Sequence, residues 1–182
     1  IYVRPFTLHE TEVYLLRKHC KWDRYQILQC YMVFGGIPFY LSLINAKESL
    51  VQNVDRLFFA QGGIMRSEFD ELYNALFSNA DLYISVVKGL AAHHDGMSRE
   101  EISKATGITG GTLTRVLTNL ERCDFISRNQ NFAHKVKDTI YRLVDFYTLF
   151  YYKFILSDVS GDEQWWSHHF ESRQVSTWQG LT

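Results

Sequence analysis

Cysteine is scarce in this sequence. It occurs only at Cys20, Cys30 and Cys123, and no two of these form a C-x-x-C pair. An odd number of cysteines without that spacing argues against a disulfide framework and against a cysteine zinc site. The pattern favours a reducing compartment, so we expect a cytoplasmic protein.

Long hydrophobic runs are also missing. The longest apolar stretch covers residues 146–156 and is interrupted by Lys153, whereas a transmembrane helix needs about 20 apolar residues. We expect no secretory signal peptide. The formal net charge of -1 provides no overall field that would attract nucleic acid or an anionic membrane. We therefore expect no contact with a membrane.

No complete catalytic motif occurs. The sequence lacks a G-x-x-x-x-G-K loop followed by Ser or Thr, an H-E-x-x-H helix and a G-x-S-x-G turn. Its two histidine pairs, at 93–94 and 168–169, are adjacent residues. Neighbours on a helix point in different directions, so such a pair is poorly placed to chelate one ion. We expect neither a catalytic residue nor a metal site in this chain.

Apolar and aromatic residues are plentiful. Hydrophobic residues make up 46% of the sequence and aromatics 15%, which is enough for a sizeable core and excludes disorder by composition. Aromatic surfaces are also one route to a homo-oligomer. The chain starts at Ile1 rather than Met, within a short alternating run typical of a strand. We therefore expect a piece of a longer protein.

Residues 1–78 have a helical pattern. Thr7 to Glu10 matches a capping box, in which a hydroxyl caps the third amide and the glutamate reaches back. We expect helices to about residue 19, over 22–34, from Pro38 onward, around 50–58 and around 69–77. The eight basic and eight acidic residues of this segment cancel. We take 1–78 as one helical domain.

Residues 79–145 have the element order of a winged helix-turn-helix. A helix ending near residue 94 is followed by a second capping box at Ser98, a short helix stopped by Gly107, and a helix over 111–122. Strands are expected over 125–128 and 139–143, joined by a turn at 129–131. The predicted fold is therefore mainly α, with a small two-stranded β-ribbon. Residues 146–182 form an aromatic helical tail that begins a further region.

The helix over 111–122 is the candidate recognition helix. Hydroxyls, amides and arginine contact phosphates or base edges, and here the candidates are Thr109, Thr112, Arg115, Asn119 and, on the ribbon, Arg128. Residues 78–145 contain nine basic and eight acidic residues, a weaker basic footprint than DNA-binding modules show. The sequence therefore favours neither interpretation: this region could be a structural or partner-binding wing, or it could bind DNA.

The segment Gly35-Gly36-Ile37-Pro38, called the corner below, is the most informative short motif. Its glycines allow the backbone to approach another group closely. Pro38 opens a helix whose amides could face an anion or the edge of a nucleotide. Local physics alone favours a plain corner between two helices.

Three motifs together resemble a known family. Residues 4–10 (RPFTLHE), 31–41 (YMVFGGIPFYL) and 141–147 (YRLVDFY), with the winged helix between the last two, are similar to prokaryotic AAA+-related, STAND-like ATP-binding proteins of the archaeal-type ATPase family. The similarity covers nearly the whole chain and matches the helical lid and winged helix of that family. The phosphate-binding loop, the magnesium-holding acid and the arginine finger of the family would lie upstream of Ile1.

The resemblance implies a nucleotide site at the corner. In such proteins the lid contacts bound nucleotide through the glycine–proline block, a role that would fall on Gly36, Ile37 and Pro38, with Gly35 beside them. Pro5 and Phe6 would lie near the adenine side. ATP or ADP with Mg would bind the full-length protein, and the upstream nucleotide-binding domain would be the partner of this segment.

The function we expect is that of a non-catalytic C-terminal segment of an ATPase. It would couple nucleotide state through the lid to a winged helix that binds a partner or DNA. The alternative is a stand-alone winged-helix transcriptional regulator, with residues 1–78 serving dimerisation or effector binding. The charge balance and the missing initial Met argue against that alternative.

Overall fold

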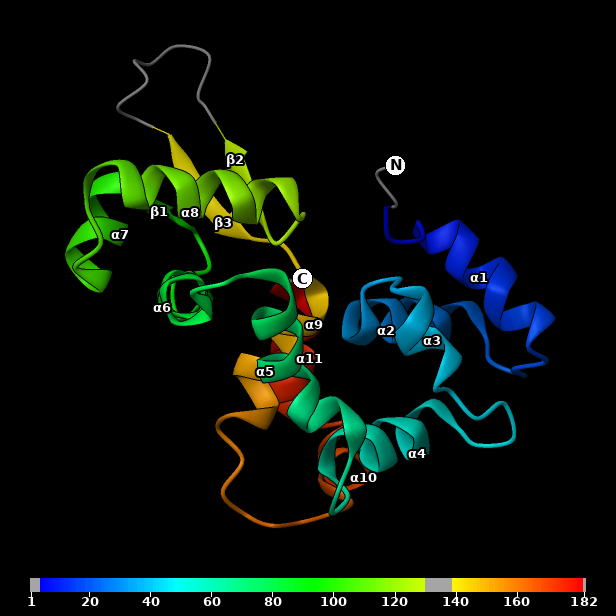
Figure 1. The fold of residues 1–182 in the computed structure, drawn as a ribbon. Helices are drawn as coiled ribbons and strands as arrows, with labels where there is room; N and C mark the ends of the chain where they lie inside the picture. Colours follow the sequence, from blue (N-terminus) through cyan, green and yellow to red (C-terminus); the bar gives the residue numbers. More distant parts are fainter. Residues whose placement is uncertain (1–3, 130–138, 182) are drawn as a thin grey trace. The chain divides into compact units, whose positions relative to one another are not determined.

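The computed structural model describes residues 4–129 and 139–181 (Figure 1). It is mainly helical, with one small antiparallel sheet. By internal contacts it divides into two compact units, Ile1–Glu68 with Phe154–Thr182, and Phe69–Lys153. We describe each unit by itself, as unit 1 and unit 2. The strand expected at 1–3 and the turn residues 130–131 lie outside the described residues.

Unit 1 begins with three helices, α1 (Leu8–Arg17), α2 (Arg24–Phe34) and α3 (Pro38–Ser42). The Thr7–Glu10 capping box is confirmed, and a second box formed by Asp23 opens α2. Each box satisfies backbone N–H groups that have no partner within the helix. Helix α3 has Pro38 at its first position, as the sequence predicts.

Helix α4 (Leu50–Val54) continues into a π-helical turn, η1 (Asp55–Phe59). The sequence predicts a regular helix here, so the π-turn is a difference. Its defining bond joins the N–H of Ala60 to the carbonyl of Asp55 at 2.8 Å. The wider turn buries the three successive apolar residues of 57–59, which a regular helix would spread around its surface.

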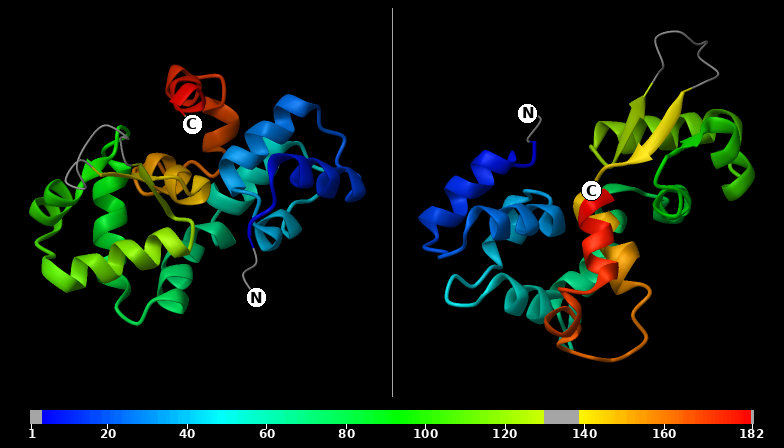
Figure 2. Two further views of the ribbon diagram at one scale, coloured as in Figure 1. Left: turned by 90° about the horizontal axis from the view of Figure 1, so that it is seen from above. Right: turned by 180° about the vertical axis from the view of Figure 1, so that it is seen from behind.

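The C-terminal segment belongs to unit 1. It includes α10 (Trp165–His169) and α11 (Arg173–Leu181), and α10 lies beside α4 (Figures 1 and 2). Trp166 and Trp178 are buried, and both meet the ring of Phe154 edge-on. Residues 146–182 are expected from the sequence to form a separate tail, whereas the contacts group residues 154–182 with the N-terminal helices.

Unit 2 contains the remaining elements. These are α6 (Ala80–Ala91), β1 (Met97–Ser98), α7 (Arg99–Thr106), α8 (Gly110–Arg122), β2 (Ile126–Asn129), β3 (Ile140–Leu143) and α9 (Phe146–Phe150). Helix α5 (Ile64–Leu76) and the π-turn η3 (Tyr151–Ile155) run across the boundary of the two units. The capping box at Ser98 and the left-handed Gly107, with φ of 72°, are both confirmed.

The sheet of unit 2 has three strands in the order β1-β3-β2, all antiparallel. The sequence predicts two strands, so β1 is a correction. In this strand Met97 pairs with Tyr141 and Ser98 with Ile140. Two residues are too few to show the alternation from which a strand is recognised in sequence, and their pairing comes from a partner far along the chain.

The core of unit 2 follows the predicted helical spacing. Four residues of α8 are buried, namely Leu113, Val116, Leu117 and Leu120. In the same unit the rings of Phe77 and Tyr83 stack with their centroids 3.8 Å apart, a geometry that adds to simple area burial. Within the described residues, no helix has the length and apolar character needed to cross a membrane.

Candidate functional site

The corner and the N-terminal segment meet through the backbone. The N–H of Phe6 donates to the carbonyl of Gly36 at 2.8 Å. Gly35 caps α2 in the left-handed conformation and Gly36 follows with φ of 70°. Glycine adopts this region without the strain that a β-carbon causes. The structure therefore brings together two motifs that lie far apart in the sequence.

Gly36 is needed for this close approach. A β-carbon at this position would come within 3.0 Å of the carbonyl oxygen of Phe6, a separation that real β-carbons essentially never show. It would also lie 2.8 Å from the ring of Tyr31. These glycines are expected from the sequence to allow another group to approach closely, and in the structure that group is the chain's own backbone at Phe6.

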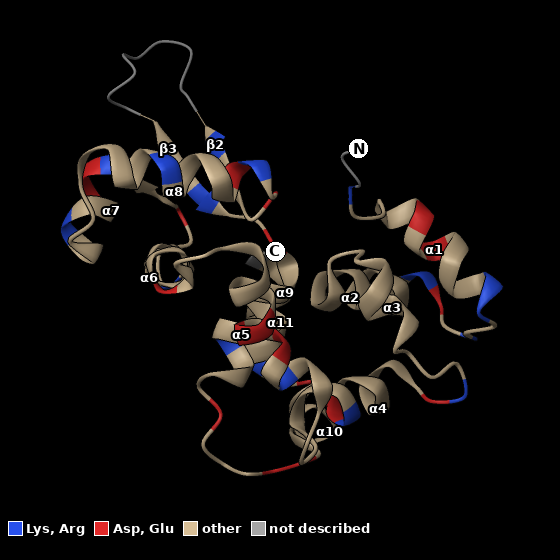
Figure 3. Ribbon diagram, viewed as in Figure 1, with Lys and Arg blue, Asp and Glu red and all other residues tan. Residues whose placement is uncertain are grey.

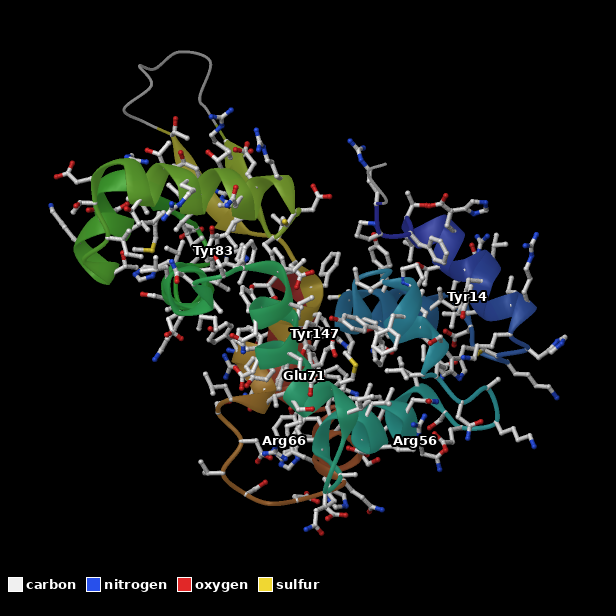
Figure 4. All side chains as sticks on the ribbon, in the orientation of Figure 1. Tyr14, Arg56, Arg66, Glu71, Tyr83 and Tyr147 are labelled. Atoms are coloured by element: carbon white, nitrogen blue, oxygen red, sulfur yellow. The ribbon has the colours of Figure 1, made fainter. Side chains whose placement is uncertain are left out.

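The side chains at the corner differ in exposure. Ile37 is half-buried, whereas Pro38 and the next residue, Phe39, are exposed, Phe39 by 51%. Pro5 and Phe6 are half-buried, and the ring of Phe6 lies 5.8 Å from that of Tyr14, which Figure 4 labels on α1. Phe39 is absent from the predicted site. Its position directly after an N1 proline, on a short helix, was the signal that could have suggested it.

The far end of α3 is held by two cations. The ammonium of Lys18 donates to the carbonyl of Leu41 at 3.2 Å and to that of Ser42. The guanidinium of Arg56, labelled in Figure 4, donates to the carbonyl of Leu43 at 3.2 Å. Partial burial lowers the pKa of Lys18. Cations suit the negative end of a helix, but sequence reasoning missed both because their partners are distant in the chain.

A carboxylate fastens the C-terminal segment to η1. Asp55 accepts the backbone N–H of Trp166 at 2.8 Å and that of Ser167 at 3.1 Å, and also the Ser167 hydroxyl. Its side chain is nearly buried, with 6% of the residue exposed. Burial raises the pKa of Asp55, and the bonds from Ser167 and Trp166 offset part of that rise.

The candidate recognition helix α8 exposes part of its predicted set. Thr109, Thr112 and Arg115 are exposed. Asn119 instead faces α6, where its amide donates to the hydroxyl of Tyr83 at 2.8 Å; Tyr83 is labelled in Figure 4.

Two further polar side chains near α8 have partners within unit 2. The guanidinium of Arg128, on β2, lies 3.4 Å from the Glu121 carboxylate. Arg99 donates to the carbonyl of Gly110 at 2.8 Å and to the hydroxyl of Thr114 at 2.9 Å. Arg99 therefore ties the start of α7 to the first turn of α8, a contact that sequence reasoning missed.

Charges of both signs are mixed on this unit. Figure 3 shows acidic and basic residues together on the ribbon of α7 and of α8. On α7 the pair Glu100 and Lys104 lies at 3.2 Å. Mixed signs weaken the field that would draw a polyanion to the surface. Among residues 4–129 and 139–181, no cluster of three His, Cys, Asp or Glu side chains could hold a metal ion.

The chain matches no protein-family model, no curated protein and no solved structure. The arrangement of its own residues is therefore the basis for a functional proposal.

Proposed function

We propose that this chain is a nucleotide-responsive, non-catalytic segment of an ATP-binding protein. In this proposal the helices of 4–68 act as a lid whose corner lies against bound ATP or ADP, and α6 to β3 form a winged helix that binds a partner or DNA. The observation that carries it is the bond from the Phe6 N–H to the Gly36 carbonyl. This bond joins the two motifs that the family resemblance assigns to the nucleotide.

The chemistry of the corner fits the base of a nucleotide better than its phosphates. Residues 35–39 carry no charge and no side-chain hydrogen-bonding group. The exposed Pro38 and Phe39, with half-buried Ile37, offer an apolar edge next to Phe6. Apolar and aromatic side chains are suited to the face of a base. The phosphates and Mg would be held by the proposed upstream domain.

The winged-helix part of the proposal is supported by element order and pairing. A short strand, two helices and two further strands follow one another, and the sheet order is β1-β3-β2. This order fits a helix-turn-helix with α8 as the second helix and β2–β3 as the wing. The exposed Thr112 and Arg115 favour a polar ligand for α8. The same two residues also fit the alternative function, a stand-alone DNA-binding regulator.

Catalysis is tested with the purified chain of 182 residues. Phosphoryl transfer needs a phosphate cradle and a metal site, and the sequence contains no phosphate-binding loop. We expect no ATP turnover above background. Steady hydrolysis that persists through repurification would contradict the non-catalytic assignment.

The nucleotide role is tested by placing a charge at the corner of the full-length protein. Asp at position 38 suits the first turn of a helix, so Pro38→Asp should preserve α3. It would also place a hydrated carboxylate against the apolar face offered to the base, and burying that charge on binding costs free energy. We expect ADP affinity to fall about tenfold or more, equivalent to about 1.4 kcal/mol.

Two matched variants control for folding. Pro38→Ala removes the proline without adding charge, and Leu16→Ala alters an exposed apolar residue elsewhere on unit 1. Titration calorimetry measures affinity, and thermal melting shows that each variant is folded. Equal ADP affinity in wild type and a folded Pro38→Asp variant would contradict the nucleotide role, and the corner would then only connect two helices.

A further inference from the structure

The π-turn η1 carries two adjacent charged residues that bind different neighbours. Asp55 bonds to the start of α10, and Arg56 bonds to the end of α3. All of these residues lie in unit 1. The corner forms the other end of α3. The π-turn η1 therefore connects α3, and through it the corner, to the C-terminal segment.

The contact with α10 is a buried helix cap. Three donors converge on the Asp55 carboxylate: the N–H groups of Trp166 and Ser167 and the Ser167 hydroxyl. A carboxylate at a helix N-terminus satisfies free amides and suits the helix dipole. The rings of Phe59, in the same turn, and Trp165 stack at 5.3 Å. Polar and apolar contacts therefore both fix α10 to η1.

The contact with α3 is a cap at its carboxyl end. Arg56 reaches the carbonyl of Leu43 while also bonding to the buried Asn53 at 2.7 Å and to Glu48 at 2.9 Å. Lys18, from α1, holds the preceding carbonyls of α3. The end of α3 is therefore positioned by a network whose central member, Arg56, belongs to η1.

We propose that η1 is a coupling joint between the corner and the C-terminal segment. Successive side chains on a helical turn point in different directions, so one turn orients Asp55 toward α10 and Arg56 toward α3. A shift of η1 moves both caps together. π-turns are less regular than α-helix and are frequent at functional sites. The joint operates whether or not nucleotide binds the corner.

The decisive variant is Asp55→Ala, measured by hydrogen–deuterium exchange on the full-length protein. Loss of the cap should speed exchange about tenfold or more in residues 165–169. If η1 is a joint, exchange in residues 38–44 should also rise by about threefold or more, while α8 stays unchanged. Faster exchange confined to residues 165–169 would contradict the coupling.

The matched control is Glu163→Gln. It removes one negative charge from an exposed residue just before α10, so it reproduces the charge change without touching the cap. We expect no change in residues 38–44. A rise there equal to that of Asp55→Ala would show that general electrostatics, rather than the joint, links the two ends.

Coupling between two sites is reciprocal, which provides a second test. Lys18→Met keeps the alkyl chain but removes the ammonium that holds the end of α3. Lys18 donates to carbonyls of α3, so its removal acts directly on that helix. The joint nevertheless predicts faster exchange in residues 165–169 of α10. Unchanged exchange there, with faster exchange in residues 38–44, would overturn the proposal.

A milder variant covers the case in which Asp55→Ala does not fold. Ser167→Ala removes one of the three donors and leaves the carboxylate with both backbone N–H groups. Its effects on residues 165–169 and 38–44 should be smaller than those of Asp55→Ala but in the same ratio. An effect on residues 165–169 alone would again contradict the joint.

Discussion

The two groups of candidate residues are held in different ways in the two units. At the corner, Phe6 and Gly36 meet through backbone groups, and the side chain of Pro38 is exposed. On α8, by contrast, Asn119 bonds to Tyr83 through its side chain. A polar side chain that bonds inside its own unit is less available to a ligand. The corner is therefore the more complete candidate site.

The largest expected effect concerns Gly36. Gly36→Ala introduces a β-carbon at φ of 70° that meets the Phe6 carbonyl, so strain and crowding add. We expect unfolding free energy to fall by about 2–4 kcal/mol, measured by chemical denaturation. Gly107 is the matched control, because it has φ of 72° but nothing within 4 Å of an added β-carbon. Gly107→Ala should cost only about 1 kcal/mol.

The difference between these two glycine variants isolates the close approach of Phe6. Equal losses for Gly36→Ala and Gly107→Ala would contradict the description of the corner as a packed backbone contact. The same result would leave the left-handed φ of 70° as the reason for glycine at position 36.

A second comparison separates two residues of α8. Asn119→Ala removes the bond to Tyr83 and leaves the hydroxyl of this buried residue without that partner, so we expect a loss of about 1 kcal/mol or more. Thr112→Ala changes an exposed residue and should stay within about 0.5 kcal/mol. Denaturation of both variants and of Tyr83→Phe measures this. Losses that add in the Asn119→Ala, Tyr83→Phe double variant would argue against a direct bond.

A third prediction concerns duplex DNA. On α8 the basic residues are Arg115 and Arg122, with Glu121 opposing them. Few phosphate contacts predict weak binding and a shallow salt dependence, because each neutralised phosphate contributes about -0.9 to the slope. Fluorescence anisotropy at several salt concentrations should show Arg115→Ala reducing the slope by about 1. Nanomolar affinity at physiological salt would show that α8 is the stronger site.

The smallest expected effect is acid weakening of one helix start in each unit. Bonds from Thr7 lower the pKa of Glu10, and bonds from Ser98 lower that of Glu101, below the ordinary value of 4.5. A lowered folded-state pKa gives stability that is present above pH 4.5 and lost as pH falls through the folded value. Glu10→Gln and Glu101→Gln should each reduce the fall in the thermal melting midpoint between pH 5 and pH 3, by about the same amount. A steeper pH dependence in either variant would contradict the capping assignment.

The parts of the fold that were predicted depend on local chemistry. Capping at Thr7 and Ser98, the left-handed Gly107 and the start of α3 at Pro38 involve residues within a few positions of one another. Such signals are readable in sequence because neighbours in the chain supply both donor and acceptor.

The parts that were missed depend on distant partners. Strand β1 pairs with β3, Asn119 turns toward Tyr83, and Asp55 caps a helix more than a hundred residues away. A single sequence does not indicate which of its polar residues will bond to a partner that is distant in the chain. The corner lies between these cases. Its turn is local and readable in the sequence, whereas the bond from Phe6 to Gly36 was not predicted. The family resemblance implied only that both segments lie near one nucleotide.

The most direct test of the central claim is hydrogen–deuterium exchange of the full-length protein with and without ADP and Mg. The proposal that the corner lies against nucleotide predicts slower exchange in residues 34–41 on addition of ADP, because ligand contact reduces local opening. Residues 109–122 of α8 should show a smaller change or none. Unchanged exchange in residues 34–41 at saturating ADP, in a protein shown by calorimetry to bind it, would contradict the assignment of the corner to nucleotide.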